Sequence, residues 1–191
     1  MPRPTRVILV TDGDEVARAA VEAAAKRLGL RVISSSAGNP TPLSGREIVR
    51  RCLQVPSDPV VVMVDDRGRA YKGKGERAAE VVARHPRIRV LGALAVASNT
   101  GKVEGTHVDA SVTASGRVVQ APVDKEGRPA PGQAVLLGDT VDVLEQLGIP
   151  VIIGIGDLGK MGGADFLEQG APVTERAIRE ILRRAAQALS Q

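Results

Sequence analysis

Residues 148–165, GIPVIIGIGDLGKMGGAD, decide the fold of this chain. After a turn at Pro150 comes the apolar, β-branched run Val151, Ile152 and Ile153, which is typical of a strand buried on both faces of a parallel sheet. Glycine-rich backbone beyond the carboxyl end of such a strand lies where open α/β sheets bind ligands. The candidate ligand-binding residues of this loop are Gly154, Gly156, Asp157, Gly159, Lys160, Gly162 and Gly163.

Two interpretations of this glycine loop stay open. Its amides and Lys160 could contact a ligand or a partner, together with Ser98 and Asn99, which end the preceding predicted strand. The loop could equally be a tight crossing with a purely structural role. It matches neither GxGxxG placed directly before a helix nor GxxxxGK[ST], because the next helix begins only near Pro172.

Strand and helix patterns alternate along the chain on both sides of residues 101–137. This alternation predicts one α/β domain over residues 1–191, with a doubly wound, mostly parallel sheet, Rossmann-like or Toprim-like, and helices on both faces. Asp139 is expected to cap one helix, and Ser44 with Glu47 another. The expected strands are 6–10, 31–34, 60–64, 88–97 and 151–153, and the expected helices are 15–28, 44–53, 75–85, 140–147 and 174–189.

The middle of the chain departs from this rhythm. Residues 108–121 alternate apolar and polar side chains around Ser115 and Gly116, which predicts a β-hairpin at the edge of the sheet. The segment contains too little apolar surface to form a second core, so we expect it to be an excursion from the same domain.

The composition narrows the class of function. Tyr71 and Phe166 are the two aromatic residues of the 191, and the net charge of +4 is spread without a Lys/Arg block, which argues against nucleic-acid binding by base stacking. The one cysteine, Cys52, is expected to be a buried structural thiol. The N-terminal sequence MPRPTRVILV has no apolar core of a signal peptide, and no run of 18 apolar residues predicts a membrane span.

Acidic residues follow three of the predicted strands. Asp12 and Asp14 come after the first, Asp65 and Asp66 after the third, and Asp157 after the last. Parallel strands point their carboxyl ends to one edge, so these carboxylates could share a crevice and hold Mg²⁺ or Ca²⁺. The alternative is that each acid caps its following helix and faces water separately.

An acid after the first strand and Asp65-Asp66-Arg67-Gly68 after a later one resemble the Toprim domain of topoisomerases, primases and small nucleases. That resemblance implies a Mg²⁺ site built from a glutamate and a DxD pair. In this chain Asp12 stands at the glutamate position, and Arg67 occupies the position of the second DxD acid.

A second resemblance covers nearly the whole chain. The segments RVILVTDGDE, SSAGNPTPLSG, DPVVVMVDDRG, VLGALAVASNT, GDTVDVLEQLGIPVIIGIGDLGKMGG and GAPVTERAI, in this order and spacing, resemble stage V sporulation protein AE in its soluble form. The resemblance implies a spore-forming bacterium and production in the forespore with the SpoVA group, whose membrane members move dipicolinic acid with Ca²⁺. It also implies residence at the spore inner membrane and a part in germination.

Three functions follow as hypotheses. The first is an accessory protein of the dipicolinic-acid channel that binds membrane partners, with a basic surface at Arg67, Arg69, Lys72 and Lys74. The second is a module that binds Ca²⁺–dipicolinate or Mg²⁺ over the acids and the glycine loop. The third is a Mg²⁺-dependent nuclease of the Toprim type, which would require an intact set of metal-binding carboxylates.

Overall fold

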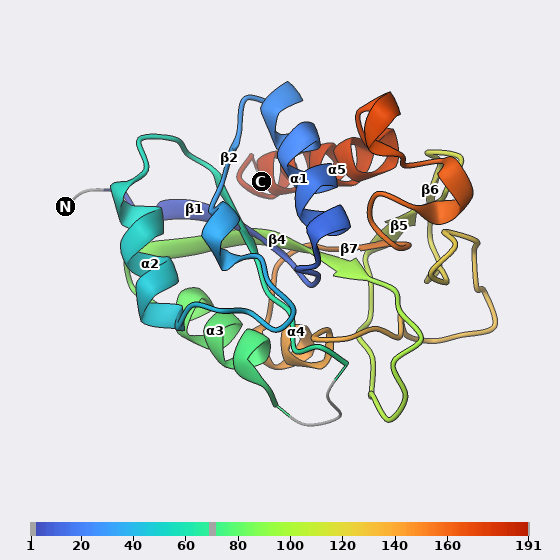
Figure 1. Cartoon of the computed structure of the whole chain (residues 1–191), viewed down its shortest axis with the longest axis horizontal. Coiled ribbons are helices and arrows are strands. Elements are labelled where there is room, and N and C mark those ends of the chain that lie inside the picture. Colours follow the sequence, from blue (N-terminus) through green and yellow to red (C-terminus); the bar gives the residue numbers. More distant parts are fainter. Residues whose placement is uncertain (1–2, 69–71, 191) are drawn as a thin grey trace.

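The computed structural model describes residues 3–68 and 72–190 and contains one seven-stranded sheet (Figure 1). The strand order is β2-β3-β1-β4-β7-β5-β6, and all neighbouring strands run parallel except β5 and β6. The α/β class with a mostly parallel sheet is therefore confirmed. The strands are β1 (Thr5–Val10), β2 (Arg31–Val32), β3 (Val60–Met63), β4 (Ile88–Val96), β5 (Ala110–Val112), β6 (Val118–Val119) and β7 (Ile152–Ile155).

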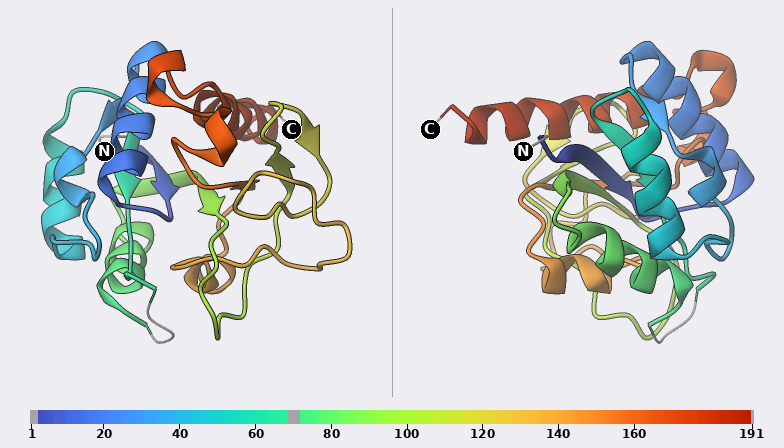
Figure 2. Two further views of the ribbon diagram at one scale, coloured as in Figure 1. Left: turned by 45° about the vertical axis from the view of Figure 1, so that its right-hand side comes forward. Right: turned by 90° about the vertical axis from the view of Figure 1, so that its left-hand side faces the viewer.

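Helices cover both faces of the sheet (Figures 1 and 2). One face packs against α1 and α5, and the other against α2, α3 and α4. The helices are α1 (Glu15–Arg27), α2 (Gly45–Gln54), α3 (Lys74–Ala83), α4 (Asp142–Leu147) and α5 (Pro172–Ala188), with short 3₁₀ helices at η1 (Ser34–Ser36), η2 (Met161–Gly163) and η3 (Leu167–Gln169). Among the described residues, no helix combines the length and apolar character that crossing a membrane would require.

The core is divided by the sheet into two aliphatic layers. Strand β1 shows the division, since Ile8 and Val10 face the α1/α5 layer while Val7 and Leu9 face the α2/α3/α4 layer. All four side chains are fully buried. A strand buried on both faces needs apolar residues at every position, which explains the uninterrupted runs in the sequence.

The predicted hairpin is present as β5 and β6, which pair antiparallel through Ser111 with Val119 and Val112 with Val118. Strand β5 also pairs parallel with β7, so the hairpin extends the main sheet at its edge. The hairpin turn includes Gly116, which adopts a positive φ of 78°.

Two predicted helix caps are present and one is wrong. Asp14 accepts a hydrogen bond from Ala17 N at the start of α1, and Ser44 with Glu47 forms a capping box at the start of α2. Asp139 does not cap the helix expected at 140–147, because α4 begins only at Asp142. The second strand is also shorter than expected, because the chain turns into η1 after Val32.

The contact between β4 and α5 gives a test of the packing. Gly92 in β4 lies under α5, where an added Cβ would be 2.7 Å from Ile181 Cγ2 and 2.7 Å from the backbone oxygen of Val151. We expect Gly92→Ala to lower the free energy of unfolding by about 1–3 kcal/mol, as overpacking does in tight cores. Urea unfolding measures this change.

Gly101 provides the matched control, because an added Cβ there meets no atom of residues 3–68 and 72–190 within 4 Å. Gly101→Ala should change the free energy of unfolding by less than about 0.5 kcal/mol. Equal stability of the two variants would contradict the described packing of α5 on β4.

Candidate functional site

A polar crevice of about 270 Å³ lies at the carboxyl ends of the central strands β1, β3, β4 and β7. Thr11 and Val96, at the ends of β1 and β4, form part of its lining. The charged residues that line it are Asp12, Asp14, Asp65, Asp139, Asp157 and Lys160. The structure thus brings together acids from after three strands and from the segment before α4.

Backbone amides hold Asp12 and Asp65 next to each other. Asp12 Oδ1 accepts a hydrogen bond from Gly13 N at 2.7 Å, and Asp65 Oδ2 accepts from the same nitrogen at 3.0 Å. Asp65 Oδ1 accepts from Arg67 N at 2.7 Å. One N–H group therefore joins the ends of β1 and β3, and a side chain at Gly13 is excluded because an added Cβ would lie 2.5 Å from Gly38 O.

Asp14, Asp157 and Lys160 form the other side of the crevice. Carboxylate oxygens of Asp12, Asp14 and Asp157 all lie within 4.8 Å of one another. Lys160 Nζ lies 3.3 Å from Asp157 Oδ2 and 3.7 Å from Asp14 Oδ2. Because Asp14 caps α1 with its other oxygen, Oδ1, the helix fixes the position of this carboxylate.

Asp139 enters the crevice by a different route. Its backbone nitrogen donates to Ser98 Oγ at 3.0 Å, which joins the segment before α4 to the chain after β4. Its carboxylate accepts a hydrogen bond from Gly68 N. Sequence reasoning missed Asp139 as a crevice residue because it follows no strand and was expected to cap a helix.

The carboxylates perturb one another. Burial, followed by the charges of Asp14 and Asp65, raises the pKa of Asp12 to about 7. Burial also raises the pKa of Asp65 to about 6. The hydrogen bond from Arg67 N lowers this pKa, and the charge of Asp139 raises it. At neutral pH, ionisation of both Asp12 and Asp65 is therefore opposed by the repulsion between the two negative charges.

Lys160 offsets part of this repulsion. Burial lowers its pKa, but the attraction of Asp157 and Asp14 outweighs burial, so the pKa is raised and the ammonium stays charged. One ammonium does not balance five acids. Oxygen ligands in this number suit a hard divalent cation such as Mg²⁺ or Ca²⁺, and Lys160 would remain beside it as a donor to an anion.

Asp66, a candidate metal ligand from the sequence, lies outside this crevice. Its Oδ1 accepts a hydrogen bond from Gly75 N at 2.7 Å and its Oδ2 from Glu76 N at 3.1 Å, in the first turn of α3. Asp66 therefore satisfies free amides of a helix N-terminus. Of the adjacent pair that resembles a Toprim motif, Asp65 alone lines the crevice.

The loop glycines serve close packing and unusual backbone angles. An added Cβ at Gly154 would collide with Ser111 Oγ, and one at Gly156 would lie 2.6 Å from Gly127 N. Gly159, Gly162 and Gly163 all have positive φ. Of the two candidates after β4, Ser98 lines the crevice, whereas Asn99 is exposed and is not part of its lining.

One residue of the candidate basic surface, which consists of Arg67, Arg69, Lys72 and Lys74, is engaged in an ion pair. Lys72 Nζ forms an ion pair with Glu80 Oε1 at 2.5 Å. Arg67, with a positive φ of 57°, and Lys74, in the first turn of α3, are exposed. Arg69 lies outside the described residues.

Asp165 organises the glycine loop and was missed in the sequence. It is fully buried, and its carboxylate accepts hydrogen bonds from Gly159 N at 2.8 Å, Val173 N at 2.8 Å, and Thr174 N and Oγ1 at 2.9 and 2.6 Å. These bonds tie the loop to the first turn of α5. No local capping signal points to Asp165, because the N-cap position of α5 is Ala171 and the exposed acid Glu168 lies nearer to the helix.

The fold and the crevice define an α/β protein with an acidic site at the carboxyl ends of its parallel strands. The family model described as stage V sporulation protein AE1 matches residues 6–185, and the chain belongs to this family. Its role therefore lies in sporulation. Comparison with curated proteins and with solved structures gives no match.

Replacement of Asp165 tests its role in the loop. In Asp165→Asn an amide NH₂ replaces one acceptor oxygen and faces donors, so we expect the free energy of unfolding to fall by about 1–3 kcal/mol. Urea unfolding measures the loss. Glu168→Gln, at an exposed acid of the neighbouring η3, is the control and should match the wild type; equal stability of both variants would contradict the assignment.

The raised pKa of Asp12 predicts a pH dependence of stability. The folded protein binds this proton more tightly than the unfolded chain, in which the pKa of aspartate is about 4. The contribution of Asp12 to the free energy of unfolding is therefore lost as the pH rises from about 4 to about 7, the pKa of Asp12 in the folded protein. Asp12→Asn removes the penalty and keeps Oδ1 as an acceptor for Gly13 N.

In metal-free buffer we therefore expect Asp12→Asn to be more stable than the wild type. The gain should widen between pH of about 4 and about 7 and stay constant above that. Urea unfolding at a series of pH values measures it. A gain that does not change with pH would show that Asp12 is not the titrating group.

Proposed function

We propose that this sporulation protein is an accessory component of the dipicolinic-acid channel group and that its crevice binds a divalent cation, with Ca²⁺–dipicolinate as the ligand. The observation that supports this most directly is the convergence of five carboxylates and one ammonium in a single crevice. Repulsion among the acids is relieved by a bound cation, and such relief contributes to binding.

In this proposal the aspartates bind the cation and Lys160 binds the anion. Asp12, Asp14 and Asp157 can each offer an oxygen to one ion, because such oxygens lie within 4.8 Å of one another. Asp65 and Asp139 add negative charge to the same crevice. Lys160 would attract the carboxylate groups of dipicolinate, which the acids alone would repel.

Binding of other proteins completes the proposal. Within the proposed role, the protein acts in the forespore and spore at the inner membrane, next to SpoVA-group or germination proteins. The exposed cations Arg67 and Lys74 support contact with acidic partners, since neither is engaged in an ion pair within the described part of the chain. Arg67 adjoins the crevice, because its backbone nitrogen donates to Asp65 Oδ1, so partner contact there would lie beside the ligand site.

Isothermal calorimetry with Ca²⁺ and with Mg²⁺, each with and without dipicolinate, tests the ligand. We expect binding of Ca²⁺ that tightens when dipicolinate is present, and a rise in Tm under the same conditions. Asp157→Asn should weaken the affinity for Ca²⁺ by about tenfold or more, and Lys160→Ala should abolish the tightening by dipicolinate while Ca²⁺ alone still binds.

Asp109→Asn is the matched control. Asp109 is exposed and accepts a hydrogen bond from Ile152 N at the start of β7, the end of the strand away from the crevice. This variant should bind Ca²⁺ as the wild type does. Absence of heat and of a Tm shift with both cations, with and without dipicolinate, would overturn the proposal.

A further inference from the structure

An apolar groove of about 510 Å³ lies between α2 and α3, outside the crevice. Its floor contains Leu43, Ala78 and Val81, and Val81 is 40% exposed although it lies in the middle of the α2/α3 contact. The two helices approach closely here because α2 begins with Gly45, where an added Cβ would collide with Val81 Cβ. The groove is thus built by direct helix packing.

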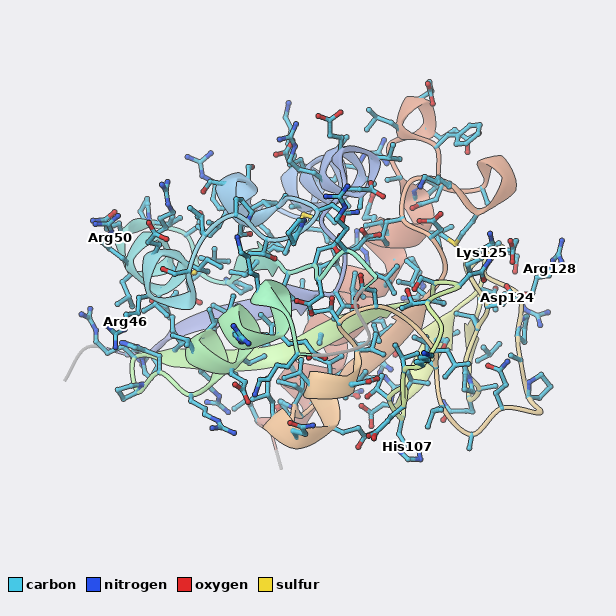
Figure 3. The ribbon with its side chains drawn as sticks, turned by 60° about the horizontal axis from the view of Figure 1, so that its bottom comes forward. Arg46, Arg50, His107, Asp124, Lys125 and Arg128 are labelled. Atoms are coloured by element: carbon cyan, nitrogen blue, oxygen red, sulfur yellow. The ribbon has the colours of Figure 1, made fainter. Side chains whose placement is uncertain are left out.

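Positive side chains surround this apolar floor. Arg46 on α2 and Lys74 and Arg77 on α3 line the groove and are exposed. Within residues 3–68 and 72–190 no ion pair engages any of the three. Figure 3 shows Arg46 and Arg50 projecting outward from α2.

The single acid in the lining is already used inside α2. The carboxylate of Glu47 accepts hydrogen bonds from Ser44 N and Ser44 Oγ, both at 2.8 Å, which lowers its pKa. Glu47 keeps its negative charge, and three cations against this one carboxylate leave the lining with a net positive charge. No ion pair within the described residues neutralises the three cations at the edge of the apolar floor.

We propose that this groove docks an acidic amphipathic segment of a partner protein. Apolar side chains on one face of the segment would fill the floor, as in helix-in-groove recognition, and its carboxylates would meet Arg46, Lys74 and Arg77. A lipid surface fits less well because the apolar residues line a hollow between two helices, which a flat bilayer would not fill.

The inference goes beyond ligand binding at the crevice and does not depend on it. It specifies the kind of partner that the proposed accessory role requires, and it extends the basic surface from Lys74 onto α2. The test is carried out in EDTA, so that failure of cation binding and failure of docking are separate results.

The probe is an amphipathic helical peptide with leucine on one face and glutamate on the other, titrated into the ¹⁵N-labelled protein. We expect saturable shifts of amide signals confined to α2, α3 and residues 42–44, weakening as salt rises. Arg46→Glu with Arg77→Glu should weaken peptide binding by at least about tenfold, because both contacts become repulsive.

Arg117→Glu with Arg128→Glu is the matched control. It makes the same change in net charge on the hairpin side of the molecule, where Arg128 lies at the opposite end from Arg46 in Figure 3. This variant should bind the peptide within about twofold of the wild type, and the amide spectra of both variants report whether they fold. The same peptide with lysine in place of glutamate should not bind.

Three results would overturn the proposal. The first is the absence of saturable shifts with the glutamate peptide. The second is an equal loss of binding in both double variants, which would indicate a net-charge effect alone. The third is binding to phosphatidylglycerol vesicles that is abolished by Arg46→Glu with Arg77→Glu, together with unchanged amide signals of the groove when the peptide is added. This result would assign the groove to a lipid surface.

Discussion

The site depends on one hydrogen-bond donor, the backbone N–H of Gly13, that is shared by two carboxylates. It joins Asp12 after β1 to Asp65 after β3, the neighbouring central strands of the sheet. Parallel pairing already brings these strand ends side by side, and the shared donor then holds like charges together that would otherwise separate. The electrostatics of the crevice follow from this constraint.

The surrounding elements keep the crevice in shape. Asp14 caps α1 with one oxygen and offers the other to the crevice, so the position of the helix and that of the charge are linked. Asp165 similarly ties the glycine loop, and with it Lys160, to the start of α5. Two aspartates thus have three roles: Asp14 is a ligand candidate and a helix cap, and Asp165 anchors the glycine loop.

Much of this arrangement can be predicted from the sequence because simple rules govern it. Uninterrupted apolar runs indicate strands buried on both faces, and parallel strands place Asp12, Asp65 and Asp157 at one edge. Asp66 illustrates where the rule stops, since its side chain serves α3 instead of the crevice. That outcome depends on how the chain after Gly68 returns to the helix, which no local pattern encodes.

The remaining differences between the sequence-based expectations and the structure also arise from long-range contacts. Asp139 reaches the crevice because its backbone binds Ser98, and these residues are far apart in the sequence. The loop glycines suggested a ligand cradle, yet Gly154 and Gly156 are explained by neighbours on β5 and on residues 125–127 that a Cβ would strike. The groove between α2 and α3 is likewise visible only once both helices are in place.

The most direct test of the crevice is the titration of Asp12 followed by ¹³C NMR of its side-chain carboxyl group. In metal-free protein the account predicts a pKa of about 7, and it predicts that saturating Ca²⁺ lowers this value, because a bound cation favours the ionised carboxylate. A pKa of about 4, the ordinary value of aspartate, both with and without Ca²⁺ would contradict it.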